Sequence, residues 1–315
     1  MLNIVSNCLI VKGRVIKSTG SFYLVTGEDS RSYSCRTRGK LRLAGYKESN
    51  PVAVGDWVLF DMEGQEGMIY EIAERANHVL RQSVKKTEHS SVLAANVDQA
   101  LLVVTLAQPR TSLGFIDRFM VSCEAYRIPQ ILIFNKADLL NTKQQEEVDT
   151  ILDLYRGIDT ECYLISAIEP SSVEPVRKIL NGKTTLIAGH SGVGKSTLIN
   201  QLAPHIKQKV NEISGYSEKG MHTTTFAEMF SLDGNTFIID TPGVKEWGLV
   251  NMNEQEISDY FPEMRELRLD CKFGSRCIHV NEPKCAILDA VESGAIAVSR
   301  YENYLGMVTG KDNRK

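Results

Sequence analysis

The chain has 315 residues, a length that favours two or three domains over a single core. Its composition, 43% hydrophobic and 24% charged, is that of a globular protein, and a net charge of −3 gives no general attraction to nucleic acid or membrane. No apolar run reaches the roughly 20 residues of a transmembrane helix, and the N-terminus lacks a signal-peptide pattern. We therefore expect a cytoplasmic protein with no membrane partner, whose odd number of cysteines, seven, favours reduced thiols.

The first part of the chain, residues 1–85, is predicted to be rich in β-strands. Gly, Asn, Asp and Pro residues separate five strand-like runs, at residues 7–18, 21–26, 32–37, 56–61 and 67–72. Five short strands are typical of an OB-like barrel, although an SH3-like barrel would give nearly the same pattern.

A basic segment lies within this part. Between residues 31 and 47 there is no acidic residue and there are six basic ones: Arg31, Arg36, Arg38, Lys40, Arg42 and Lys47. Such a cluster alone is typical of a solvated surface. On an OB-like barrel it is also a candidate RNA-binding face.

From residue 86 to about 253 the pattern changes to that of an α/β domain. Near-continuous apolar runs occur at residues 100–107, 130–134, 162–165, 184–188 and 236–239, and helical spacing occurs at 115–126 and 144–155. Buried strands that alternate with helices predict a mostly parallel sheet flanked by helices.

A base-recognition motif, Asn135-Lys136-Ala137-Asp138, follows the strand predicted at 130–134. The Asp138 carboxylate can accept hydrogen bonds from guanine N1–H and the exocyclic amine, which adenine does not offer. We expect Asn135 to tie this loop to its neighbours. Ser166-Ala167, after the next strand, would offer backbone N–H groups to guanine O6.

A phosphate-binding loop follows the strand at 184–188 and precedes a helix-like segment. Its residues are Gly189, His190, Ser191, Gly192, Val193, Gly194, Lys195, Ser196 and Thr197. In this context the backbone N–H groups wrap the phosphates, Lys195 reaches the β and γ phosphates, and the Ser196 hydroxyl binds Mg²⁺. This loop follows the base-recognition loop, the reverse of the usual order, which predicts a circularly permuted P-loop GTPase domain.

The remaining nucleotide motifs lie after the phosphate loop. Asp240 ends the last predicted strand and is a candidate Mg²⁺ ligand, while the Gly243 N–H can contact the γ phosphate. A threonine-rich segment supplies a further Mg²⁺ ligand, Thr224 or Thr225. Val244 replaces the glutamine that orients water in Ras-type enzymes, and His222 is the nearest candidate for that role.

Three cysteines and a histidine cluster near the C-terminus, in a stretch that separates helix-like segments at 254–269 and 286–307. The ligand set Cys271, Cys277, His279 and Cys285 predicts a closed, structural zinc site. We therefore expect residues 254–315 to form a C-terminal helical zinc-binding domain.

Together these motifs resemble the RsgA (YjeQ/EngC) family of circularly permuted GTPases. The resemblance implies GTP hydrolysis coupled to late maturation of the small (30S) ribosomal subunit, with binding to the subunit and its rRNA and stimulation by it. It also implies that His222 is the catalytic group. The family usually has four residues between the first two cysteines and an arginine before the histidine, whereas this chain has five residues and Met221.

The whole chain is thus predicted to be a multidomain α/β protein: an OB-like barrel at 1–85, the permuted GTPase domain at 86–253 and the zinc-binding domain at 254–315. We expect a monomer that binds GTP and GDP with Mg²⁺ and holds one structural Zn²⁺. Two other functions remain open: an RNA-binding module that reports nucleotide state with negligible turnover, and an ATP-dependent kinase, which Asp138 argues against.

Overall fold

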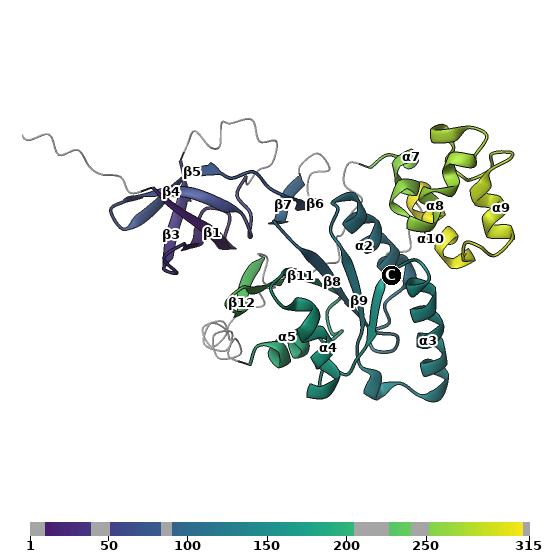
Figure 1. Cartoon of the computed structure of the whole chain (residues 1–315), viewed down its shortest axis with the longest axis horizontal. Helices are drawn as coiled ribbons and strands as arrows, with labels where there is room; N and C mark the ends of the chain where they lie inside the picture. The colour runs from purple at the N-terminus through teal and green to yellow at the C-terminus, as the bar shows by residue number, and fades with distance from the viewer. Residues whose placement is uncertain (1–9, 39–50, 83–89, 205–226, 241–251, 311–315) are drawn as a thin grey trace, which may run out of the picture. The chain divides into compact units, whose positions relative to one another are not determined.

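The computed structural model describes residues 10–38, 51–82, 90–204, 227–240 and 252–310 (Figure 1). The chain forms two compact units. The first unit comprises Met1–Asp98, Leu180–Leu186 and Ile213–Gly243, and the second comprises Gln99–Ile179, Ile187–Glu212 and Val244–Lys315. Among the described helices, none has the length and apolar character needed to cross a membrane.

The first unit contains a closed five-stranded barrel. Its strands are β1 (Val11–Ser18), β2 (Tyr23–Gly27), β3 (Ser32–Thr37), β4 (Trp57–Glu63) and β5 (Glu66–Ile72). They pair in the order β1-β2-β3-β5-β4, and β4 pairs back to β1. The β3–β5 pairing is parallel, whereas the other pairings are antiparallel. This order confirms the OB-like barrel, since an SH3-like barrel pairs its strands antiparallel.

Alternation of buried and exposed positions places one face of each strand inside the barrel. Val15, Val25 and Phe60 are fully buried, as period-2 strands that close around a core require. The same unit holds strands that the sequence did not predict. They are the antiparallel pair β6 (His78–Gln82) and β7 (Ser90–Ala95), and β12 (Glu228–Asp233), which pairs antiparallel with β13 (Thr236–Asp240).

The second unit contains a parallel three-stranded arrangement, β10-β9-β8. Its strands are β8 (Gln99–Val104), β9 (Gln130–Phe134) and β10 (Glu161–Leu164). All six residues of β8 are buried, as expected for a strand covered on both faces. The helices that accompany these strands are α2 (Leu113–Ala125), α3 (Thr142–Arg156), α4 (Pro170–Leu180) and α5 (Lys195–Leu202) (Figure 1). The strand β11 (Thr184–Ala188) is buried throughout and ends at the phosphate loop.

The C-terminal part of the second unit is built from short helices, which corrects two predictions. The stretch 254–269 is not one helix but α7 (Glu254–Ile257), α8 (Pro262–Arg265) and 3₁₀ turns, because Pro262 has no N–H to continue a preceding helix and stands at the first position of a new one. The stretch 286–307 is two helices, α9 (Ala286–Glu292) and α10 (Val298–Val308), and Gly294 turns the chain between them with φ +79°.

Candidate functional site

The phosphate loop turns from β11 into α5 through three glycines with positive φ: Gly189, Gly192 and Gly194. A Cβ on Gly189 would lie 2.3 Å from Val103 O, and one on Gly194 would lie 2.2 Å from Asn135 Nδ2. Only glycine therefore fits these two positions, because both the backbone angle and the close neighbours exclude a side chain. Lys195 Nζ lies over the loop and donates to Gly189 O at 2.6 Å and His190 O at 2.8 Å.

Asn135 connects three loops that the sequence could only identify separately. It is 4% exposed, and its Nδ2 donates to Val193 O at 2.8 Å in the phosphate loop. Its Oδ1 accepts from the Ala167 N–H at 2.9 Å. The carboxamide thus fixes the base-recognition loop to the phosphate loop on one side and to the Ser166-Ala167 loop on the other, which confirms its expected tying role.

Asp138 is held in position by Ser166, whose Oγ donates to Asp138 Oδ1 at 2.5 Å. Lys136 adopts a left-handed backbone conformation, φ +68°, and its Nζ donates to Gln108 O. The Ser166 N–H donates to Ser172 Oγ at 2.8 Å, and the Ala167 N–H is the one bonded to Asn135. Both amides thus have partners within the protein, and their expected contact with guanine O6 stays a prediction.

Two of these partners, Gln108 and Ser172, were not identified from the sequence. A backbone carbonyl before a proline and a serine on a surface helix have no distinguishing pattern. Their contacts exist only because the ends of the parallel strands bring the loops together at one edge of the sheet.

The other nucleotide motifs fall largely outside the described residues. His222, Thr224, Thr225 and Gly243 all lie there, as do Met221 and Val244. Asp240 is described and is the last residue of β13, in the first unit.

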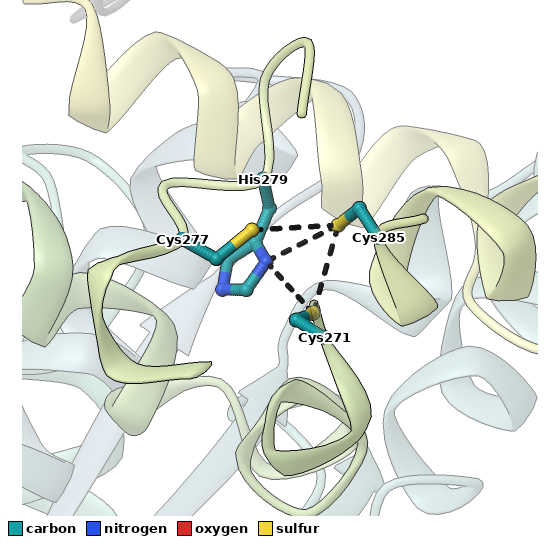
Figure 2. A group of neighbouring side chains, drawn as sticks. All are labelled: Cys271, Cys277, His279 and Cys285. Carbon is teal, nitrogen blue, oxygen red and sulfur yellow. Dashed lines mark hydrogen bonds between the residues drawn. The ribbon is translucent and has the colours of Figure 1, made fainter. Parts of the chain in front are cut away.

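The second candidate site is the cysteine–histidine cluster, in which Cys271, Cys277, His279 and Cys285 point toward one another (Figure 2). All four are buried, and their ligand atoms lie within 4.8 Å of one another. The Cys271–Cys285 and Cys277–Cys285 sulfur pairs are both 3.8 Å apart, and His279 Nδ1 lies 3.6 Å from Cys271 Sγ and 3.3 Å from Cys285 Sγ. Tetrahedral coordination with metal–sulfur bonds of about 2.3 Å places sulfurs about 3.8 Å apart, so the cluster fits a metal ion.

The chemistry of the cluster also favours a cation. Burial raises the pKa of Cys277 to about 12 and raises that of Cys285, so these thiols hold their protons at neutral pH unless a metal displaces them. Burial lowers the pKa of His279, which favours the neutral imidazole that binds metals.

The turn that carries the histidine is fixed by its neighbours. The Glu282 carboxylate accepts from the N–H groups of Ile278 at 2.7 Å and Val280 at 2.8 Å. The five residues between Cys271 and Cys277 include a 3₁₀ turn, Gly274–Arg276. This longer loop still brings both cysteines into the cluster.

The candidate RNA-binding face is only partly described. Its arginines pair with acids: Arg31 with Asp29 at 3.7 Å, Arg36 with Glu66 at 3.1 Å, and Arg38 with Asp61 at 2.9 Å and Glu63 at 2.6 Å. Lys40, Arg42 and Lys47 lie outside the described residues. The arginines counted as free positive charge in the sequence are thus partly neutralised by acids from other strands and turns.

Comparison with known proteins identifies relatives along almost the whole chain. The family model described as RsgA GTPase matches residues 72–250, and the one described as RsgA N-terminal domain matches residues 12–69. The Small ribosomal subunit biogenesis GTPase RsgA 2 of Bacteroides thetaiotaomicron is 49% identical over 307 residues, which cover 97% of this chain and 98% of that protein. The Small ribosomal subunit biogenesis GTPase RsgA of Christiangramia forsetii is 48% identical over 307 residues, covering 96% and 97%.

Two solved structures are similar over the same extent. The crystal structure of YjeQ from Thermotoga maritima has a TM-score of 0.75 and 31% identity, and the match covers 98% of this chain and all of that one. The structure of YloQ, described as a circularly permuted GTPase, has a TM-score of 0.72 and 32% identity, with 97% and 96% covered.

Proposed function

Because the chain belongs to the RsgA GTPase family, and is therefore a GTPase, we propose that it hydrolyses GTP in the biogenesis of the small (30S) ribosomal subunit. It binds the subunit and its rRNA, assists a late step of maturation, and is stimulated by the subunit. The names of its relatives support the subunit as partner.

The observation that carries the nucleotide site is the position of Asn135. Its carboxamide joins the phosphate loop at Val193 to the Ser166-Ala167 loop. The phosphate-binding and base-binding elements are thereby held in one arrangement, which supports a single bound nucleotide that spans them.

We assign the contacts to GTP and Mg²⁺ on the motif positions. The base is bound by residues 135–138 with Ser166 and Ala167, and the phosphates by residues 189–197 with Gly243. Mg²⁺ is held by Ser196 and Asp240 together with Thr224 or Thr225, and Lys195 and His222 are the catalytic residues. When bound, Mg²⁺ neutralises charge on the β and γ phosphates.

The metal in the cluster of Cys271, Cys277, His279 and Cys285 is Zn²⁺, and its role is structural. The distances between these ligand atoms support it, because three thiolates and one imidazole complete a tetrahedral shell and leave no position for a substrate. We further propose that the functional division of the chain is 1–85, 86–253 and 254–315, and that the protein acts as a cytoplasmic monomer.

A second candidate function follows from Val244, which cannot orient a water molecule as the Ras glutamine does. On this alternative the chain binds RNA and reports its nucleotide state, with negligible turnover. Measuring GTP turnover with and without purified small subunits separates the two. We expect stimulation on the order of tenfold or more, as when a partner completes a GTPase active site. Equal rates would contradict the leading function.

A further inference from the structure

The first turn of α2 contacts the phosphate loop directly. Ser112 caps the helix, and its Oγ accepts from the Phe115 N–H at 3.3 Å. The Phe115 ring is 8% exposed and lies on the imidazole of His190, with ring centroids 3.9 Å apart and planes inclined by 34°. His190 is the second residue of the phosphate loop, and its carbonyl accepts from Lys195 Nζ.

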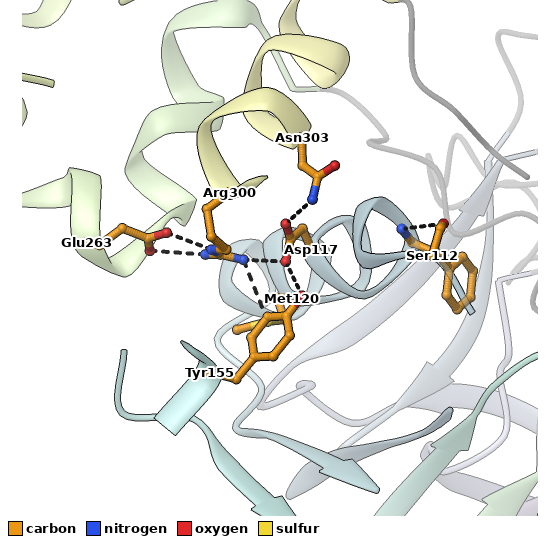
Figure 3. Close-up of polar contacts among 8 residues, drawn as sticks. Ser112, Asp117, Met120, Tyr155, Glu263, Arg300 and Asn303 are labelled. Atoms are coloured by element: carbon orange, nitrogen blue, oxygen red, sulfur yellow. Dashed lines mark hydrogen bonds and ion pairs between the residues drawn. The ribbon is translucent and has the colours of Figure 1, made fainter. Parts of the chain in front are cut away.

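Two residues further along, α2 carries a buried ion pair (Figure 3). Asp117 is fully buried and accepts from Arg300 Nη1 at 2.5 Å, from the Tyr155 hydroxyl at 2.7 Å and from Asn303 Nδ2 at 2.6 Å. Arg300, 2% exposed, also donates to both oxygens of Glu263 at 2.6 and 3.0 Å. Moving α2 away from α10 would separate Asp117 from Arg300 and leave uncompensated charges buried. The ion pair therefore fixes the position of α2 relative to α10.

Helix α10, which supplies Arg300 and Asn303, also contacts the turn that carries His279 of the cysteine–histidine cluster. The Tyr301 hydroxyl donates to the carbonyl of His279 at 2.7 Å, and the Tyr304 hydroxyl donates to that of Ile278 at 2.8 Å. On α2, Val121 belongs to the same hydrophobic core as the three cysteines of the cluster. A continuous set of packed contacts therefore runs from the cysteine–histidine cluster through α10 and α2 to the phosphate loop. All of these contacts lie within the second unit.

We propose that α2 positions the phosphate loop, with Phe115 setting the place of His190 and the Asp117–Arg300 pair fixing α2 to the C-terminal region, residues 252–310, which carries the cysteine–histidine cluster. Phe115 is thus a positioning residue for nucleotide binding, and the C-terminal region supports the GTP site through α10. The proposal rests on guanine-nucleotide binding by this loop and does not depend on the ribosomal partner.

The first test replaces the ring that contacts the loop and measures GDP binding and GTP turnover of the full chain, without ribosomal subunits. For Phe115→Leu we expect the Kd for GDP and the KM for GTP to rise about tenfold while kcat stays within about twofold, since the loop binds ground and transition states alike. Phe115→Tyr keeps the ring and should have the wild-type Kd for GDP and KM for GTP.

These readouts separate positioning from a loss of stability. A partly unfolded population lowers the apparent kcat and leaves KM unchanged, so a fall in kcat alone for Phe115→Leu would overturn the proposal. The matched control is Phe60→Leu, which removes a fully buried ring from the barrel, far from the phosphate loop in sequence, and should leave KM unchanged. No binding of GDP by the wild-type chain would overturn the nucleotide function itself, whereas an unaltered Kd in Phe115→Leu would overturn only the role of α2.

The second test addresses the connection to α10. Asn303→Ala removes one donor from Asp117 and leaves both ions in place, so the chain keeps its fold; we expect the Kd for GDP to rise about threefold. If both residues act on the same loop, the double variant Phe115→Leu with Asn303→Ala raises the Kd for GDP by less than the product of the two single fold-changes. Glu302→Ala, at an exposed position next to Asn303, is the control and should have no effect. An unchanged Kd in Asn303→Ala, or a full product in the double variant, would overturn this connection.

Discussion

The Asp138 carboxylate accepts a hydrogen bond from Ser166 Oγ, and Ser166 is itself 2% exposed. A carboxylate has about four acceptor positions, so this bond orients Asp138 and leaves acceptors for a base. On the proposed assignment, specificity for guanine therefore depends on one side chain that is already held in place.

Replacing that carboxylate should change the preferred base. In Asp138→Asn the carboxamide keeps one acceptor oxygen for guanine N1–H but presents its NH₂ donor to the guanine amine, and this donor–donor contact should weaken GTP binding on the order of 100-fold. Xanthine has a carbonyl in place of the amine, so binding of xanthosine triphosphate should improve. Competition between the two nucleotides measures both changes.

The control for this substitution is Asp153→Asn, which makes the same change of charge at an exposed position of α3. It should alter neither affinity. A variant of Asp138 that kept its preference for guanine would contradict the assignment of the base-recognition loop.

The sequence predicts the chemistry of these residues better than their contacts. Asn135 was expected to tie its loop to the neighbouring loops, because its place in the motif defines that role, and the structure confirms it. The ring contact between Phe115 and His190 has no signal in the sequence, because it joins residues far apart in the chain. The pairing of Arg36 and Arg38 with acids was missed for the same reason.

At the scale of elements, continuous apolar runs gave the most accurate predictions. The strands β9 and β11 have the predicted bounds, because a strand buried on both faces is apolar along its whole length and ends where polar loop residues begin. Helical spacing was less reliable in the C-terminal region. There Pro262 and Gly294 break stretches whose apolar residues still recur at helical intervals.

The C-terminal region that carries the cysteine–histidine cluster offers a prediction at this scale. Its hydrophobic core includes all three cysteines of the cluster, so the ion should be part of the core rather than an addition to it. We expect about one equivalent of zinc by elemental analysis. Chelation should make residues 252–310 sensitive to protease, because a structural metal contributes directly to folding.

The matched substitutions for that experiment are both serine for a buried cysteine. Cys271→Ser should lose the metal and its protease resistance. Cys162→Ser, whose thiol donates to Thr160 O at 3.3 Å outside the cluster, should keep both. Full protease resistance of the chelated chain would show that the region does not need its metal.

The OB-like barrel offers a second prediction, at the exposed pair Arg36–Glu66. If this face contacts rRNA phosphates, Arg36→Gln should weaken binding to the small subunit and reduce the slope of log affinity against log salt by about 0.9. Glu66→Gln removes the acid that competes for Arg36 and should not weaken binding.

Since exposed ion pairs contribute about 0–1 kcal/mol, neither change should affect folding. Equal salt slopes for both variants and the wild type would argue that Arg36 lies outside the RNA contact.

At the scale of the whole molecule, the circularly permuted order expected from the motifs is confirmed by the family and by the solved structures. Starting the domain at the base-recognition loop places residues 240–243, the segment proposed to contact Mg²⁺ and the γ phosphate, shortly before the C-terminal region in sequence. The second unit joins the phosphate loop to that same region through α2 and α10. The C-terminal region is thus connected to the nucleotide site both along the chain and through packed helices.

This double connection predicts that the nucleotide controls binding to the small subunit. A GTP analogue that resists hydrolysis should favour the binding state, and coupling between two sites typically changes affinity 5- to 150-fold, so we expect at least about tenfold tighter binding than with GDP. Co-sedimentation with purified small subunits measures it. The Asp138→Asn chain provides the internal control, since it should co-sediment with a xanthine analogue and not with the guanine one. Equal co-sedimentation of the GDP and GTP-analogue forms, with equal protease patterns at residues 252–310, would mean that the bound nucleotide changes neither subunit binding nor the conformation of the C-terminal region.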